Sequence, residues 1–346
     1  MSPLPLSTPN IPPALTLKTG SRLHFGPLSY RPQSGRHFGG CGLMISEPGI
    51  EIRVQVATED EVTVRKVTEI DDGAGLDVPG DMPTRVIRFV TRFREYFQDQ
   101  FSVPPTKIEV RQAIASHVGL GSGTQLALAV GQSLAILSGQ SGLTVQEIAR
   151  AMGRGARSAI GINGFQRGGL FVDGGKRTSN ELGTPITRLE LPNEWYFLIV
   201  RPLSVSGLHG EEEKAAFDQL GPMPESTTAR LCQTLVMDLL PSIVSEDYPA
   251  ASEALYTYGA LAGEFFAPLQ GGIFASPQMN KLATLLQSEQ IRGVGQSSWG
   301  PTLFALMPNR ETAELWRDRL RKEDVGQGVL IQIGEPLQHG AVLEFE

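Results

Sequence analysis

The sequence predicts a two-domain α+β protein. Its 346 residues exceed what a single compact core usually holds. Segments of alternating polarity are mixed with helical patterns and do not repeat as βαβ units, which argues against a doubly wound sheet. The composition, 40% hydrophobic and 19% charged, is that of a soluble globular protein.

The composition also excludes several classes of protein. No apolar run approaches the roughly 18–20 residues that a membrane-spanning helix needs. The proline-rich start lacks the basic and apolar parts of a signal peptide, so residues 1–14 are expected to form a flexible arm. Cys41 and Cys232 form no metal-like cluster, which favours a reducing, cytoplasmic location. The net charge of −7 argues against general nucleic-acid binding.

The first predicted elements are two strands and a helix. Residues 51–67 alternate in polarity on both sides of a Thr-Glu-Asp turn, which is typical of two half-buried antiparallel strands. Apolar residues at helical spacing predict a helix over residues 81–101, with Asp81 and Pro83 as start signals.

A strand, a turn and two helices follow. Residues 106–113 alternate as a strand does and run into a glycine-rich turn and then an apolar helix over residues 125–137. A second helix is expected over residues 144–152, because Thr144 and Glu147 have the spacing of a capping box.

The second half of the chain starts after a change of composition. Residues 168–175 predict a short strand between turns, and residues 195–203 predict a buried strand that opens a second domain. The domains are therefore expected at residues 15–190 and 191–346. Later helical patterns lie at residues 227–240, 248–266, 278–287 and 310–321, and a strand lies at 328–336.

Acidic residues are absent from three long segments, residues 1–46, 110–146 and 148–172. The same segments carry Arg22, Arg31, Arg36, Arg111, Arg150, Arg154, Arg157 and Arg167. Each segment also contains a glycine-rich stretch. Chance could produce one such segment, but three together predict parts of one site for a strongly negative ligand.

The glycine-rich turn, HVGLGSGT at residues 117–124, is the strongest of these signals. Its glycines let consecutive N–H groups converge on phosphate oxygens, and the helix that follows favours negative charge. Ser122 and Thr124 add hydroxyl donors. No lysine follows the glycines, so this is not a Walker-A loop. The alternative is a plain tight turn between strand and helix.

Two more segments supply basic and aromatic candidates. In residues 19–45, Arg22 and Arg36 suit phosphate or carboxylate recognition, whereas His24 could be structural or catalytic. In residues 153–175, the basic pair Arg154 and Arg157 could bind anions or cap helix carbonyls, and Phe165 could be core or stack on an aromatic ligand.

Two late segments are weaker candidates. In SGLHGEEEK, residues 206–214, His209 precedes glutamates that could hold Mg²⁺ through waters or begin a solvated helix. In GVGQSSWGPT, residues 293–302, small residues would let the backbone approach a ligand closely, as in the glycine-rich turn. Trp299 and Pro301 would form a rigid wall beside them. No Ser-His-Asp order or metal-ligand spacing compels a hydrolase or zinc site.

These motifs together resemble a known superfamily. GLGSGT and GVGQSSWG resemble the phosphate loop and third motif of the GHMP kinases. With GSRLHFG, GRHFGGCGLMI and GINGFQRGGLFVDGG, the chain is similar to the β-ribofuranosylaminobenzene 5′-phosphate synthases over about residues 16–308. The resemblance implies a two-domain GHMP kinase-like fold, with a ribosomal protein S5 domain 2-like N-terminal domain and a ferredoxin-like C-terminal domain.

The resemblance also implies an activity. That family joins 5-phosphoribosyl 1-diphosphate to 4-aminobenzoate or 4-hydroxybenzoate, releasing CO₂ and diphosphate, in methanopterin biosynthesis. It implies Mg²⁺, no organic cofactor, a homodimer, and no nucleic-acid or membrane partner. Two departures favour a synthase over a kinase: Gly123 replaces the usual second serine, and Asn163 lies in the stretch where many kinases have a catalytic aspartate.

The resulting assignments cover the following residues. The diphosphate loop is Gly119, Leu120, Gly121, Ser122, Gly123 and Thr124. The catalytic set is Arg22, His24, Arg36 and His209, and the other substrate contacts are Phe38, Arg154, Arg157, Asn163, Phe165, Ser297 and Ser298, with Glu211 and Glu212 near the metal. The alternatives are an ATP-dependent GHMP small-molecule kinase and a non-catalytic phosphoribosyl or nucleotide sensor.

Overall fold

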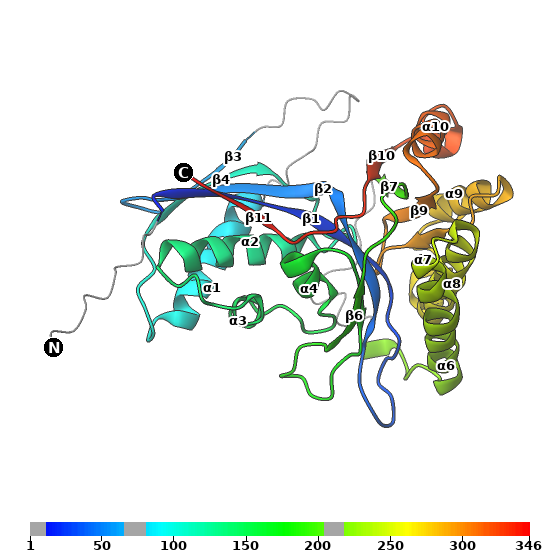
Figure 1. Ribbon diagram of the computed structural model, residues 1–346, viewed down its shortest axis with the longest axis horizontal. Coiled ribbons are helices and arrows are strands. Elements are labelled where there is room, and N and C mark those ends of the chain that lie inside the picture. Colours follow the sequence, from blue (N-terminus) through cyan, green and yellow to red (C-terminus); the bar gives the residue numbers. More distant parts are fainter. Residues whose placement is uncertain (1–11, 66–80, 204–217) are drawn as a thin grey trace.

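The first 190 residues and the last strand of the chain build a seven-stranded sheet. The computed structural model describes residues 12–65, 81–203 and 218–346. The main path of the sheet runs β11-β1-β2-β4-β3, and β5 and β6 join it through β2. These strands are β1 (Ala14–Gly26), β2 (Gly40–Val56), β3 (Glu61–Val64), β4 (Thr106–Gln112), β5 (Leu170–Asp173), β6 (Pro185–Leu189) and β11 (Val342–Phe345). The end of the chain therefore returns to the sheet with which the chain starts (Figure 1).

Four helices lie along one face of this sheet (Figure 1). They are α1 (Met82–Phe97), α2 (Ser122–Leu137), α3 (Val145–Ala151) and α4 (Ile160–Arg167). The apolar side chains of α1 fall on one stripe, with Val86, Phe89 and Phe93 buried. The middle helix, α2, is apolar almost all round because α1, α3, α4 and the sheet enclose it.

A four-stranded antiparallel sheet forms the second half, in the order β10-β7-β9-β8. Its strands are β7 (Tyr196–Pro202), β8 (Val294–Gln296), β9 (Leu303–Met307) and β10 (Val329–Gly334). Helices connect its first strand to its second and its third to its fourth. This order, 4-1-3-2 with βαββαβ connections, confirms the ferredoxin-like domain that the resemblance implies.

The helices of this half lie beside the second sheet (Figure 1). They are α6 (Glu225–Gln233), the π-helix η1 (Thr234–Leu239), α7 (Leu240–Val244), α8 (Tyr248–Gln270), α9 (Pro277–Ser288), α10 (Arg310–Leu320) and the 3₁₀ turn η2 (Asp324–Gly326). The long helix α8 contacts both β1 and β8, so it joins the two halves. Among the described helices, none combines the length and apolar character that crossing a bilayer requires.

The predicted elements are largely confirmed, with one difference in pairing. The two strands expected within residues 51–67 are the end of β2 and β3, but β4 lies between them: β2 pairs with it antiparallel and β3 pairs with it parallel. Helix α1 forms the crossover from β3 to β4. Alternating polarity shows that a segment is a strand but does not say which neighbour it takes. The strands β1, β6, β8, β9 and β11 and the helix α4 were not predicted.

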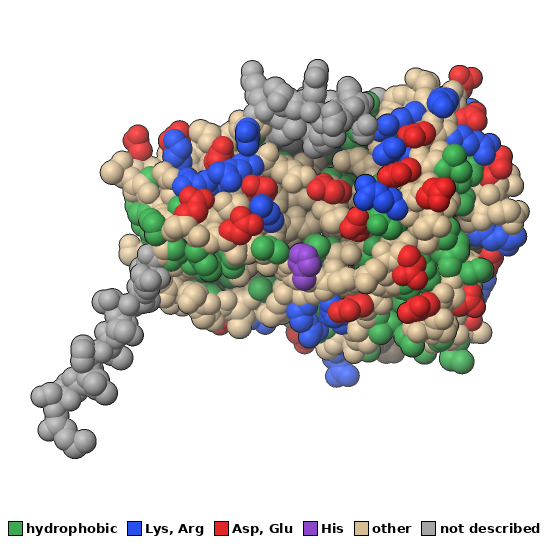
Figure 2. Space-filling view, turned by 45° about the horizontal axis from the view of Figure 1, so that its top comes forward, with side chains coloured by type: hydrophobic (Ala, Val, Ile, Leu, Met, Phe, Trp, Pro, Cys, Tyr) green, Lys and Arg blue, Asp and Glu red, His purple; other side chains and the backbone are tan. Residues whose placement is uncertain are grey.

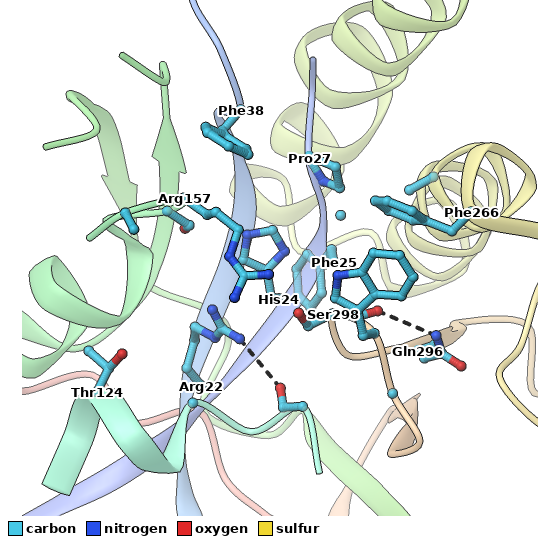
Figure 3. Close-up of a pocket in the computed structure, with 18 of the residues that line it drawn as sticks. Arg22, His24, Phe25, Pro27, Phe38, Thr124, Arg157, Phe266, Gln296 and Ser298 are labelled. Carbon is cyan, nitrogen blue, oxygen red and sulfur yellow. Dashed lines mark hydrogen bonds between the residues drawn. The ribbon is translucent and has the colours of Figure 1, made fainter. Parts of the chain in front are cut away.

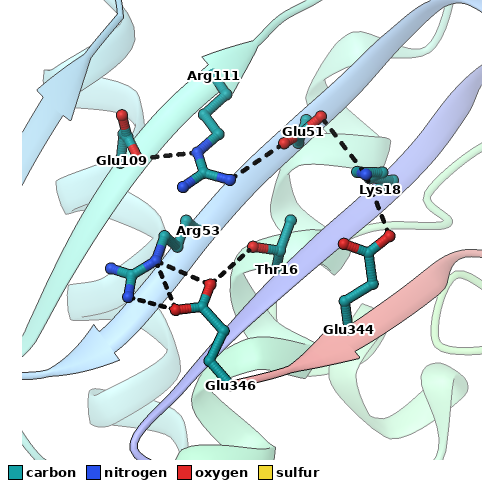
Figure 4. A network of polar contacts seen from close by, with 8 residues as sticks. All are labelled: Thr16, Lys18, Glu51, Arg53, Glu109, Arg111, Glu344 and Glu346. Carbon is teal, nitrogen blue, oxygen red and sulfur yellow. Dashed lines mark hydrogen bonds and ion pairs between the residues drawn. The ribbon is translucent and has the colours of Figure 1, made fainter.

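The solvent face of the first sheet carries a chain of ion pairs across its strands (Figure 4). Arg53 on β2 bonds Glu346 beside β11, and Arg111 on β4 bonds Glu51 and Glu109. Such exposed pairs contribute at most about 1 kcal/mol each. Figure 2 shows basic and acidic side chains interspersed on this side of the molecule. This mixture of charges gives a polyanion such as nucleic acid no uniformly basic surface to bind there.

The predicted capping box of α3 is present and gives a stability test. The Thr144 side chain accepts a hydrogen bond from the Glu147 N–H at 3.2 Å, and the Thr144 N–H donates to the Glu147 carboxylate at 2.7 Å. Thr144→Ala should lower the free energy of unfolding by about 1 kcal/mol. Urea unfolding measures this, with the exposed Ser141→Ala in the same turn as control. Equal midpoints for the two variants would contradict the capping role.

Candidate active site

A cavity of about 410 Å³ lies where the two halves of the chain meet (Figure 3). Its walls come from β1, the glycine-rich loop before α2, the segment between α3 and α4, the helix α8 and the loop after β8. None of the described residues that line it is acidic, while Arg22, Arg85, Arg154 and Arg157 all line it. The cavity is therefore electropositive and suited to an anionic ligand.

The glycine-rich loop forms one wall and presents the start of α2. Gly121 is the N-cap residue of the helix and has a left-handed conformation, with φ +74°. No described side chain accepts a hydrogen bond from the first N–H groups, and the first turn contains no acidic residue. Gly121, Ser122, Gly123 and Thr124 all line the cavity. The positive end of the helix dipole and its first N–H groups thus face the cavity without competition from a carboxylate.

The loop is bonded to the segment after β8. The Ser297 hydroxyl donates to the Gly119 carbonyl oxygen at 2.8 Å and accepts from the His24 N–H at 3.0 Å. The Thr302 hydroxyl donates to the Val118 carbonyl oxygen at 2.6 Å. Ser297 is fully buried behind the loop, whereas Ser298 lines the cavity. Ser297 was expected to contact substrate, but it lies where it positions the loop and β1.

Arg22, His24 and Arg157 form a basic group in the middle of the cavity. Arg22 lies against Gly121, since a Cβ on that glycine would be 3.4 Å from the Arg22 Nε. In Figure 3, Arg22 and Arg157 lie beside His24, with Phe25 and Phe266 on its other side. Burial, and then the charges of Arg22 and Arg157, hold the pKa of His24 well below its usual range. The imidazole is therefore neutral at neutral pH.

Aromatic side chains form another part of the cavity. The ring centroids of Phe266 on α8 and Trp299 lie 4.7 Å apart, and both line the cavity. Small residues of α8, Gly259 and Ala262 among them, line the same wall and leave room for a ligand beside the rings. An aromatic molecule can stack or pack edge-to-face here.

Backbone strain also concentrates at the cavity. Phe38, His117 and Ser298 have φ of 63°, 57° and 56°, in the left-handed region that glycine favours, and all three line the cavity. Each such residue costs of order 1–3 kcal/mol and is usually retained where a site needs its geometry. The strain therefore agrees with a functional cavity.

Several predicted site residues lie elsewhere. Arg36 donates to the Gly174 carbonyl oxygen at 2.9 Å and to the Thr184 hydroxyl at 2.6 Å, so it holds a turn and does not line the cavity. Phe165 is 1% exposed within the hydrophobic core, and its expected stacking on a ligand is wrong. Leu120 and Asn163 are buried and do not line the cavity. His209, Glu211 and Glu212 lie outside the described residues.

Arg85 and the wall formed by α8 were not predicted from the sequence as parts of the site. Arg85 shares the buried stripe of α1 with Val86 and Phe89, and an arginine in an apolar stripe is a signal that could have found it. The α8 residues that line the cavity are small or aromatic and look like ordinary core, so no sequence signal marks them.

Comparison with known proteins identifies the family. Residues 85–169 match the GHMP kinases N terminal domain. The β-ribofuranosylphenol 5′-phosphate synthase of Archaeoglobus fulgidus is 30% identical over 312 residues, which cover 84% of this chain and 87% of that protein. The chain belongs to the β-ribofuranosylphenol 5′-phosphate synthase family. It is therefore an enzyme, and the recognition made from its motifs is confirmed.

Other relatives agree with this family and fold. The β-ribofuranosylphenol 5′-phosphate synthase of Methanothermobacter thermautotrophicus is 27% identical and covers 84% of this chain and 88% of its own. A homoserine kinase from Cytophaga hutchinsonii superposes with a TM-score of 0.64 at 16% identity, over 98% of this chain and all of that one. This chain therefore has the GHMP kinase-like fold.

Proposed function

We propose that this enzyme transfers the 5-phosphoribosyl group of 5-phosphoribosyl 1-diphosphate to a 4-substituted benzoate, with loss of CO₂ and diphosphate. One observation carries the proposal. A single cavity combines a glycine-rich helix start, four arginines without a lining carboxylate, and an aromatic wall. A phosphorylated sugar diphosphate and an aromatic acid together need all three.

The chemistry needs charge stabilisation more than it needs a base. The bond between ribose C1 and the diphosphate oxygen breaks, and its electrons leave with the diphosphate. The ring carbon that bears the carboxylate forms the new C–C bond to C1. The bond to the carboxylate then breaks, its electrons restore aromaticity, and CO₂ leaves. Donors aimed at the leaving group are the main requirement.

The position of each group of residues in the cavity suggests its task in this reaction. The loop Gly119 to Thr124 would hold the diphosphate at the start of α2. Arg22 and Arg157 lie beside His24, between the loop and the aromatic wall, where the benzoate carboxylate and the reacting sugar carbon would meet. The ring would pack against Phe266 and Trp299.

The acceptor and the cellular setting are part of the proposal. The relatives are named for a ribofuranosylphenol, which favours 4-hydroxybenzoate over 4-aminobenzoate as acceptor. Methanopterin biosynthesis and a homodimer are proposed from the resemblance alone, and a cytoplasmic location is proposed from the cysteine content of the sequence. Mg²⁺ is likewise proposed from the resemblance. No described residue that lines the cavity offers the ion a carboxylate, so no step of the reaction is assigned to it.

A labelled-carbon assay tests the reaction. The protein is incubated with 5-phosphoribosyl 1-diphosphate, Mg²⁺ and carboxyl-labelled 4-hydroxybenzoate or 4-aminobenzoate, and labelled CO₂ is collected. Release should require the sugar diphosphate and should not occur with ATP in its place. Phosphorylation of an alcohol by ATP would instead support the kinase. A ligand-induced rise in melting temperature with no product from either benzoate would support the sensor.

A further inference from the structure

Four arginines gather at one end of the cavity and extend beyond it. Arg85, Arg88 and Arg92 follow one another on α1 at helical spacing, and Arg154 follows α3. The two elements are in contact, because the Arg92 Nε donates to the Ala151 carbonyl oxygen at 2.9 Å. We call these four residues the arginine cluster. Within residues 12–65, 81–203 and 218–346, none of the four has an ion-pair partner.

The cluster carries an electrostatic cost. Burial, followed by the charges of Arg88, Arg92 and Arg85, lowers the pKa of Arg154 to about 10. Burial is also the main cause that lowers the pKa of Arg85, with Arg88 adding to it and Asp81 opposing it. Like charges this close destabilise the empty site, and an anion placed among them would remove the repulsion.

The hydrogen bonds of the cluster leave one buried donor, on Arg154, without an acceptor in the described part of the chain, whereas Arg85 donates to the Ser116 hydroxyl oxygen and Arg92 to the Ala151 carbonyl oxygen. Phe89 lies between Arg88 and Arg154, whose guanidinium carbons are 5.9 Å and 5.0 Å from its ring centroid. Such contacts stabilise a cation by about 0.5–1 kcal/mol at an exposed site. The Arg154 Nε is buried and has no hydrogen-bond partner among the described residues. A buried donor without an acceptor costs about 1–3 kcal/mol, so this one points to an acceptor supplied by a ligand.

The cluster meets the cavity beside the first turn of α2. A Cβ built on Gly123 would lie 3.6 Å from the Arg154 Nη1 and 3.9 Å from the Arg85 Nη2. Arg85 is 8% exposed, and both arginines line the cavity, whereas Arg88 and Arg92 are exposed outside it. A group bound there would meet two guanidiniums and the positive end of a helix together.

We propose that the arginine cluster is a subsite for a terminal phosphate group, held between Arg85, Arg154 and the first turn of α2. A dianionic phosphate offsets the charge of the cluster better than a carboxylate does, and its oxygens can accept from both guanidiniums. The identity of the ligand rests on the proposed function, whose substrate has two terminal phosphates. Because the cluster adjoins the glycine-rich loop, the end of the leaving diphosphate is the expected occupant.

The test measures binding without turnover. Inorganic diphosphate and ribose 5-phosphate are titrated separately into wild type, Arg154→Gln and Arg150→Gln, and the melting temperature is followed. Arg150 is exposed at the end of α3 and does not line the cavity, so it is the matched control. Arg154→Gln should bind diphosphate roughly 10- to 100-fold more weakly, and Arg150→Gln should bind it as the wild type does.

A second readout separates binding from a structural role. Without ligand, Arg154→Gln should melt no lower than the wild type, because losing one charge relieves the repulsion. Arg88→Gln changes only an exposed side chain and should also weaken binding, by a smaller factor, since it removes charge from the same cluster.

The possible outcomes test the phosphate subsite and the proposed reaction separately. Weakened binding of either diphosphate or ribose 5-phosphate in Arg154→Gln supports a terminal-phosphate subsite and says which end occupies it. Binding of both ligands as tightly as in the wild type overturns the subsite. Failure of the labelled-CO₂ assay with an Arg154-dependent diphosphate site would overturn the proposed reaction and leave the subsite standing.

Discussion

Gly119→Ala should lower turnover in the labelled-CO₂ assay by about a hundredfold or more. Gly119 has φ +83°, and a Cβ there would lie 2.3 Å from the Ser297 carbonyl oxygen and 3.0 Å from the Gly300 carbonyl oxygen. Both neighbours are backbone, so the loop itself must move. A displacement of about 1 Å at a catalytic site can cost 10²-fold in rate.

Two other glycines serve as controls for this substitution. Gly328 has φ +70° with nothing within 4 Å of a built Cβ, so Gly328→Ala carries the backbone strain without the collision. Gly142 has neither the positive φ nor a close neighbour. Both alanine variants should turn over as the wild type does. Wild-type turnover by Gly119→Ala would refute the placement of the diphosphate on this loop.

The sequence identifies the loop because its signal is local. A strand, closely spaced glycines and an apolar helix are adjacent in the chain, and β4, the loop and α2 appear where that pattern predicts them. Arg22 is also found from local composition, since it lies in a basic, acid-free segment. Helix ends and turns depend on near neighbours, so one sequence is enough to locate them.

The rest of the cavity depends on contacts between distant segments. The α8 wall belongs to the site only because α8 packs beside β1, more than two hundred residues earlier in the chain. Arg85 enters the cavity because α1 lies against α2 and α3. Periodicity shows which face of a helix is buried but not what that face meets. For the same reason, the sequence assigns Arg36 and Phe165 to the site although they lie elsewhere. Their residue types suit a ligand, but Arg36 bonds backbone carbonyl oxygens and Phe165 packs in the hydrophobic core.

His24 should make the protein lose stability as the pH falls below about 6.5. Burial, and then the charges of Arg22 and Arg157, hold its pKa in the folded state well below the value of 6.5 that an exposed histidine has. Between these two pKa values the unfolded chain binds the proton and the folded chain does not. The stability contributed by His24 is therefore complete above pH 6.5 and is lost on acidification through that window, by up to about 1.4 kcal/mol per pH unit.

His24→Gln removes this titration while keeping a polar side chain. Its urea midpoint should fall less between pH 7 and pH 5.5 than that of the wild type. His339→Gln, at an exposed histidine outside the cavity, should follow the wild type. Identical pH dependence in all three proteins would contradict a buried neutral His24. Inorganic diphosphate should reduce the acid sensitivity of the wild type, because an anion on the loop that Arg22 contacts offsets part of the positive charge that opposes protonation of His24. The effect of burial would remain, so the ligand should weaken the pH dependence without abolishing it.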